Sequence, residues 1–200
     1  MKGTKEDILL TALRLFARDG FEAASVSDIA GELGMTKGAL YKHYKSKRDI
    51  FESIVARMAE RDSQSAQEHE LPEGTKSEME DKYSAAKSDM ILEFSRAQFA
   101  YWTEDEFASS FRKMLMLEQF RDEEMSELYQ QYIVSGPLGY MTDLLESLGC
   151  KEPQVKALCF YAPMFFLYSV YDSGRTELAK ELAGEHFSRV CREILENKRK

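Results

Sequence analysis

Hydrophobic residues recur at helical spacing along most of the chain, and no long window alternates as a β-strand does. The first apolar stripe consists of Ile8, Leu9, Ala12, Leu13 and Phe16. Thr4 and Asp7 form a capping pattern before it, which predicts a helix that packs the N-terminal domain together. The pattern predicts an all-α fold with about nine helices.

The next apolar run is short and ends at Gly34, a residue type that commonly stops a helix. Ser25 and Asp28 form a capping box at its start. Thr36, a favourable N-cap, follows two residues after the glycine, so another short helix begins directly after it. Two short helices joined by a glycine turn, about residues 25–44, are typical of a helix-turn-helix, whose second helix enters the major groove of DNA.

A longer helix is predicted from the capping pattern at Ser46 to a point near Gln67, and it connects two domains. A loop is expected at residues 72–74, where proline and glycine interrupt an acidic stretch. We therefore divide the chain into an N-terminal domain, residues 1–61, and a larger helical domain, residues 62–200.

The larger domain contains strongly apolar helical segments. They span residues 89–102, 107–120, 123–148, 153–171 and 175–197. Ser135–Pro137 is expected to interrupt the third segment, because proline removes a backbone hydrogen bond and glycine adds freedom. Pro163 is expected to bend the fourth segment.

Charge sets the helix-turn-helix apart from the rest of the chain. The whole chain has a net charge of -8, but residues 34–48 contain five cations and no Asp or Glu. These cations are Lys37, Lys42, Lys45, Lys47 and Arg48. A polyanion is therefore attracted to this end of the molecule, although a solvated basic face on an ordinary helix pair is the simpler alternative.

Residue types within the second short helix divide into two faces. Leu40 and Tyr44 are placed to pack inward, and Tyr41, Lys42 and His43 to face a groove. The small residues Gly38 and Ala39 allow close approach of the backbone to a partner. Lys47, beside the free N–H groups that begin the next helix, is expected to bind phosphate. The three histidines are scattered, so no metal site is predicted.

Residues 4–55 resemble the DNA-binding domain of the TetR/AcrR family of transcriptional regulators. The matching segments include Ile8–Phe16, Gly20–Phe21, Val26–Ala30, Gly34–Tyr44 and Ser46–Lys47. Met35 and Ile50 stand where the family more often has valine and leucine. The resemblance implies DNA contacts at Thr36, Lys37, Gly38, Tyr41, His43 and Lys47, with Ser25 and Ser27 reaching phosphate. Reasoning from the residues adds Ala39 and Lys42.

The resemblance also implies that residues 62–200 hold an inducer pocket and a dimer interface. Methionine and aromatic residues are dense there and suit an apolar or aromatic small molecule, although for any one residue a plain core role is as good an interpretation. The candidate ligand contacts are Phe94, Gln98, Trp102, Phe111, Met114, Tyr129, Tyr132, Met141, Met164 and Tyr168. Glu93, Glu118 and Gln119 are further polar groups that can orient a ligand.

The sequence thus predicts a ligand-responsive repressor that binds a palindromic double-stranded operator as a homodimer. The two subunits are expected to pair through their last two helices. An activator of the same fold, or a helical ligand-binding or interaction module without DNA binding, is the alternative. An enzyme is disfavoured because catalytic and phosphate-binding motifs are lacking, and no cofactor is expected. We expect a cytoplasmic bacterial protein without membrane association, because neither a signal peptide nor a membrane-spanning run is seen. When bound to DNA, it is expected to be associated with the nucleoid. Its three cysteines lack C-x-x-C spacing and are expected to be structural thiols.

Overall fold

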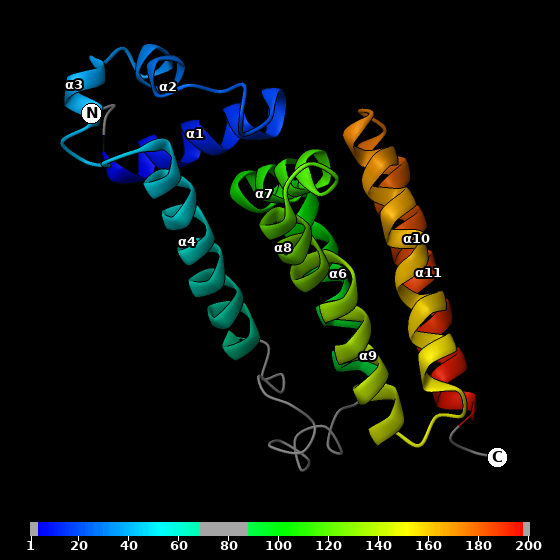
Figure 1. The fold of residues 1–200 in the computed structure, drawn as a ribbon. Coiled ribbons are helices and arrows are strands. Elements are labelled where there is room, and N and C mark those ends of the chain that lie inside the picture. Colours follow the sequence, from blue (N-terminus) through cyan, green and yellow to red (C-terminus); the bar gives the residue numbers. More distant parts are fainter. Residues whose placement is uncertain (1–3, 69–87, 198–200) are drawn as a thin grey trace. The chain divides into compact units, whose positions relative to one another are not determined.

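The computed structural model describes residues 4–68 and 88–197, and these residues form helices and connecting turns without a strand (Figure 1). In chain order the helices are α1 (Lys5–Asp19), α2 (Val26–Glu32), α3 (Lys37–Leu40), α4 (Lys47–Glu68), α6 (Ser88–Glu104), α7 (Glu106–Glu118), α8 (Glu123–Ile133), α9 (Ser135–Ser147), α10 (Pro153–Asp172) and α11 (Thr176–Asn197). The predicted all-α class is confirmed. The loop predicted at residues 72–74 lies outside the described residues.

The helices pack as two units. Unit 1 comprises Met1–Asp62 and Glu106–Tyr129, and unit 2 comprises Ser63–Asp105 and Gln130–Lys200. Unit 1 therefore contains α7 and the first part of α8 together with α1–α3 and most of α4. The division drawn from the sequence at residue 61 does not include this second segment of unit 1.

Unit 1 is built on α1, whose apolar stripe is buried against α2 and α7. The predicted cap is present: the Thr4 hydroxyl accepts from the Asp7 N–H at 3.2 Å, and the Asp7 carboxylate accepts from the Thr4 N–H at 2.9 Å. Helix α1 ends at Gly20, whose φ of 91° lies in the region that favours glycine. Phe16, at the end of the stripe, is completely buried.

The two short helices begin where the caps predict, but α3 is a single turn that ends at Leu40, and residues 41–43 form a further turn. Ser25 caps α2 and Thr36 caps α3, each by accepting a backbone N–H three residues later at 3.2 Å. Gly34 makes the turn with φ of 66°, and the following N–H, that of Met35, donates to the Ala30 carbonyl at 2.9 Å. This is the hydrogen bond by which a left-handed residue ends a helix.

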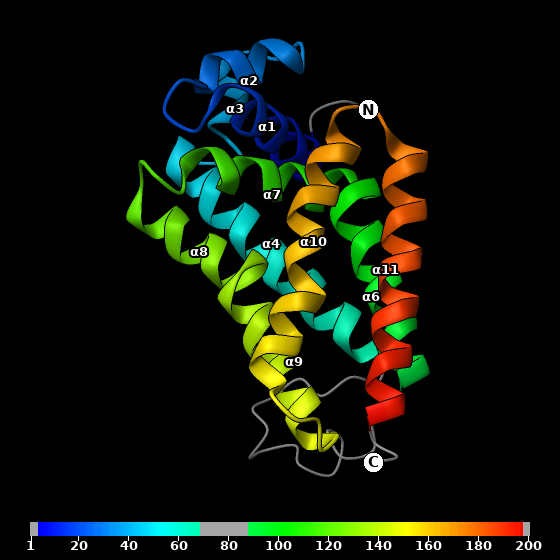
Figure 2. The same ribbon diagram turned by 90° about the vertical axis from the view of Figure 1, so that its right-hand side faces the viewer.

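Unit 2 contains α6, α9, α10 and α11, and α10 packs against both α9 and α11 (Figure 2). Aromatic side chains fill its core. Phe99 and Tyr168 stack with centroids 5.7 Å apart, and Phe160 and Phe187 lie 5.4 Å apart. None of the described helices is long and apolar enough to cross a bilayer.

The predicted interruption near residues 135–137 is present, and the break falls at Val134, between α8 and α9. Pro137 lies in the first turn of α9, where a missing N–H costs no intrahelical hydrogen bond. Gly136 permits the close approach: a Cβ there would lie 1.9 Å from the Gln131 carbonyl oxygen. The tight turn therefore requires glycine at this position.

Candidate nucleic-acid interface

The residues expected to read DNA lie on α3, on its cap Thr36 and on the turn that follows it. Leu40 and Tyr44 are buried as predicted, with exposed fractions of 0% and 5%. Thr36, Lys37, Gly38 and Lys42 are exposed, as is Tyr41, and Ala39 and His43 are half-buried. The Lys37 ammonium lies 5.9 Å from the centre of the Tyr41 ring. The α3 region thus forms an accessible and cationic surface.

Helix α2 begins with a tightly bonded serine. The Ser25 hydroxyl donates to the Asp28 carboxylate at 2.6 Å, and that carboxylate also accepts from the Ser25 N–H at 2.9 Å. These bonds lower the pKa of Asp28, the side-chain hydrogen bond contributing most. Ser27 is exposed one residue into the helix. Ser25 therefore serves first as a helix cap, whereas Ser27 is accessible to a phosphate.

The five cations of residues 34–48 fall into two groups. Lys37, Lys42 and Lys45 are exposed and take part in no ion pair among the described residues. Lys47 is held against the protein by backbone carbonyls, and Arg48 is paired with carboxylates. We call the accessible lysines, with Thr36, Gly38, Tyr41 and His43, the recognition surface. Three of the five cations therefore remain available to a polyanion.

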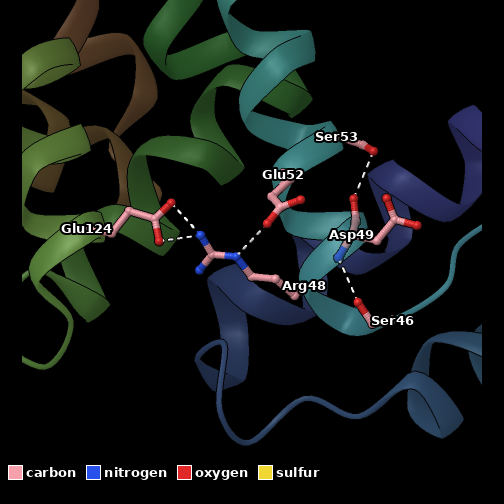
Figure 3. A network of polar contacts seen from close by, with 6 residues as sticks. All are labelled: Ser46, Arg48, Asp49, Glu52, Ser53 and Glu124. Carbon is pink, nitrogen blue, oxygen red and sulfur yellow. Dashed lines mark hydrogen bonds and ion pairs between the residues drawn. The ribbon is translucent and has the colours of Figure 1, made fainter.

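Arg48 joins the start of α4 to the start of α8 within unit 1 (Figure 3). Its guanidinium donates to both oxygens of Glu124, one at 2.6 Å, and to Glu52 at 3.0 Å. The bonds to Glu124, and then that to Glu52, raise the pKa of Arg48. Bidentate pairs of this kind fix geometry as well as charge.

The cap of α4 differs in part from the predicted box. The Ser46 hydroxyl accepts from the Asp49 N–H at 3.0 Å as expected. The Asp49 carboxylate, however, accepts from the Lys45 N–H at 2.7 Å. Both groups still satisfy backbone donors near the start of α4, so the local conformation before the helix is fixed.

Helix α7 supplies unit 1 contacts that the sequence did not indicate. Glu106, at its start, pairs with Arg14 of α1. Glu118, at its end, is only 3% exposed and accepts from the Phe21 N–H at 2.8 Å. Glu118 was considered a ligand-orienting group, but its carboxylate is directed at the turn after α1. No local pattern reveals this contact, because 97 residues separate the partners.

The ten candidate ligand contacts are divided between the units. Phe111, Met114 and Tyr129 belong to unit 1, and the other seven belong to unit 2. Eight of the ten are buried; Phe94 and Gln98 are half-buried. Burial fits a core role as well as a ligand role, so the ligand site stays a prediction. Tyr168 of α10 is itself part of the Phe99–Tyr168 ring stack. Met164 of α10 and Trp102 of α6 are buried and lie within four residues of that stack along the chain.

The thiols and acidic groups show no clustered chemistry. Cys150 and Cys191 are buried, Cys159 is exposed, and none of the three forms a disulfide. In the portion of the chain that the structure describes, no three His, Cys, Asp or Glu side chains gather as metal ligands would.

The family model for bacterial regulatory proteins of the tetR family matches residues 8–54. This segment runs from the first buried residue of α1, through the helix-turn-helix, into α4. Residues 8–54 thus match the DNA-binding segment of TetR-family regulators. All the residues of the recognition surface lie within the TetR match.

Curated relatives match over a stretch of similar length. AcrR of Shigella flexneri, an HTH-type transcriptional regulator, is 45% identical over 51 residues, which is 26% of this chain and 24% of that protein. BepR of Brucella suis, an HTH-type transcriptional repressor, is 43% identical over 54 residues, 27% of this chain and 26% of that protein. The matched segment therefore spans about a quarter of the length of these relatives. They are regulators and not enzymes.

Solved structures extend the likeness to the whole fold. A TetR-family regulator from Mesorhizobium loti has a TM-score of 0.61 at 16% identity, covering 96% of this chain and 94% of that one. SmeT, in complex with triclosan, has a TM-score of 0.59 at 19% identity, covering 92% and 88%. The chain thus has a TetR-family fold, with the helix-turn-helix followed by a larger helical part.

Proposed function

We propose that this protein is a DNA-binding transcriptional regulator, a repressor that a small apolar or aromatic molecule releases from its operator. The observation that carries the DNA-binding part is the recognition surface: a capped helix-turn-helix with three exposed lysines in a chain of net charge -8. The repressor assignment is supported by BepR, which is named a repressor.

Binding to DNA is expected to weaken steeply with salt, because lysines displace condensed counterions from the phosphates. Lys42→Ala removes one exposed cation from the recognition surface. We expect it to weaken binding to all sequences and to lower the magnitude of the slope of log K against log salt by about 1. Fluorescence anisotropy with labelled DNA from upstream of the gene, at several salt concentrations, measures both quantities.

The matched control is Lys151→Ala, which makes the same charge change at an exposed residue of unit 2. It is expected to leave the salt slope unchanged. If the unaltered protein does not bind the DNA even at low salt, the proposal fails. The chain is then the helical interaction module without DNA binding.

The effector is proposed to bind among the apolar side chains of unit 2. Support comes from the buried aromatic and methionine side chains of α6 and α10, and from SmeT, whose structure holds triclosan. Trp102 is the single tryptophan and is 6% exposed in α6. The DNA titration can therefore be repeated with triclosan as the probe while the fluorescence of Trp102 reports binding.

A homodimer is proposed because one short recognition helix reads few base pairs, and two-fold pairing places a second one on a half-site roughly 34–36 Å away or a multiple of it. Helices α10 and α11 pack together, and we propose that the large apolar side chains they expose form one face. Its members are Val155, Leu158, Phe166, Leu178 and Leu182, with exposed fractions of 39% to 68%. An apolar face of this kind is typical of an interface between subunits.

Phe166→Glu is expected to weaken self-association by about 100-fold, because a carboxylate in an apolar interface loses its hydration. Phe166 is 68% exposed in the single chain, so the substitution does not disturb the core of unit 2. Sedimentation velocity across a range of protein concentrations measures the effect. Phe120→Glu is the control, since Phe120 is 88% exposed on unit 1. A dimer that survives Phe166→Glu unchanged rules out this face.

A further inference from the structure

The turn between α1 and α2 is held by a buried carboxylate from a distant helix. Glu118, the last residue of α7, accepts from the Phe21 N–H at 2.8 Å and is 3% exposed. The space it occupies is left free by Gly20, where a Cβ would lie 2.6 Å from the Glu118 Oε1. Glycine, the carboxylate and the N–H therefore fit one another.

The carbonyl groups of the same segment accept hydrogen bonds from Lys47. The Lys47 Nζ donates to the Phe21 carbonyl at 2.6 Å and to the Glu22 carbonyl at 3.2 Å. The same ammonium lies 4.4 Å from the centre of the Phe21 ring. An ammonium has three N–H donors, and two are used by these carbonyls. The Lys47 side chain is accordingly only 24% exposed.

The Phe21 side chain is fixed as firmly as its backbone. The centroid of its ring lies 5.1 Å from the ring centroid of Phe16 and 5.3 Å from that of Phe51. Phe16 and Phe51 are both completely buried. Phe21 is therefore held at its N–H, its carbonyl and its ring. The next contact along the chain, from the Ala24 N–H to the Gly20 carbonyl at 3.2 Å, leads directly to the cap of α2 at Ser25.

We propose that Glu118 and Lys47 form a clamp on Phe21 that positions the helix-turn-helix for DNA, and that Lys47 serves this clamp and not the DNA phosphates. The clamp rests on the proposed DNA-binding function, and it makes both charged groups positioning residues. Lys47 was predicted from the sequence to contact phosphate. The structure instead directs its ammonium to two carbonyls.

The clamp and simple electrostatics predict different changes in DNA affinity and in its salt dependence. Removing the negative charge of Glu118 from a DNA-binding unit is expected by electrostatics alone to tighten binding, and removing Lys47 to weaken it with a lower salt slope. If the two residues act as a clamp, Glu118→Ala and Lys47→Ala both weaken DNA binding. Neither then changes the salt slope, because no phosphate contact is lost.

The test measures affinity and salt slope for Glu118→Ala, Lys47→Ala and the double variant, with Lys42→Ala as the phosphate-contact control. We expect each single variant to bind about tenfold more weakly, because the segment that leads to the cap of α2 then loses the contacts of one of its two charged partners. The double variant is expected to lose less than the product of the two, because both residues hold the same segment. Glu118→Gln keeps an acceptor oxygen and is expected to restore most of the affinity.

A second measurement is independent of DNA. Hydrogen–deuterium exchange of the peptide covering residues 20–24 is expected to accelerate in Glu118→Ala and Lys47→Ala, and to stay unchanged in Lys42→Ala. Tighter DNA binding by Glu118→Ala, a salt slope lowered by about 1 in Lys47→Ala, or unchanged exchange would each overturn the clamp. If the unaltered protein binds no DNA, the proposed function fails, and exchange still decides whether the clamp exists.

Discussion

Replacing Gly38 with glutamate is expected to reduce DNA affinity by at least about 100-fold while leaving the fold intact. Gly38 is exposed on α3, and a Cβ built there meets no atom within 4 Å. The new side chain therefore has room in the protein. It places a carboxylate between Lys37 and the base edges and phosphates, where like charges cost several kcal/mol. Fluorescence anisotropy measures the affinity, and thermal unfolding by circular dichroism reports the fold.

Two alanine variants are the controls for this prediction. Gly38→Ala adds a methyl group in open space and favours the helix by up to about 1 kcal/mol, so stability is kept or raised. Gly34→Ala places a side chain at φ of 66° in the turn and is expected to destabilise the protein. DNA binding by Gly38→Glu that matches the unaltered protein would show that α3 does not face DNA.

Replacing Phe111 with alanine is expected to lower the free energy of unfolding by about 3–5 kcal/mol. Phe111 lies in α7 and has no exposed surface, so its removal leaves a cavity in unit 1. Urea unfolding followed by circular dichroism measures the change. Phe111 was predicted from the sequence as a ligand contact, and this outcome would show that it also contributes to the core of unit 1.

Phe120→Ala provides the comparison for the same change of side chain. Phe120 is 88% exposed in the same unit, so its removal is expected to alter the free energy of unfolding by no more than about 0.5 kcal/mol. If the two variants were equally stable, the burial of Phe111 would not be an energetic contribution to the fold.

The features that were predicted from the sequence are those with a local signal. The caps at Thr4, Ser25 and Thr36 and the turn at Gly34 each depend on residues within a few positions, and all four are found as expected. The burial of Leu40 and Tyr44 follows in the same way, because helical spacing places both inward, although α3 itself ends at Leu40.

The features that were missed depend on pairs far apart in the chain. Arg48 and Glu124 are 76 residues apart, and Phe21 and Glu118 are 97 apart. Periodicity does not report such pairs. Lys47 shows the related difficulty that a cation in a basic segment suits a phosphate and a backbone carbonyl equally well. Within the protein its ammonium donates to two carbonyls and lies 4.0 Å from the Glu22 carboxylate, and its phosphate contact stays a prediction. The ligand contacts stay a prediction for a similar reason, since burial of an aromatic side chain fits either role.

The return of the chain into unit 1 at residues 106–129 has a consequence for engineering hybrid regulators. A chimera made by exchanging only the first 62 residues would separate Arg14, Phe21 and Arg48 from the glutamates that hold them. A transplant that also carries the α7–α8 segment keeps all three partnerships. The part of the chain to transfer with the helix-turn-helix is thus a pair of segments that are not contiguous in the polypeptide.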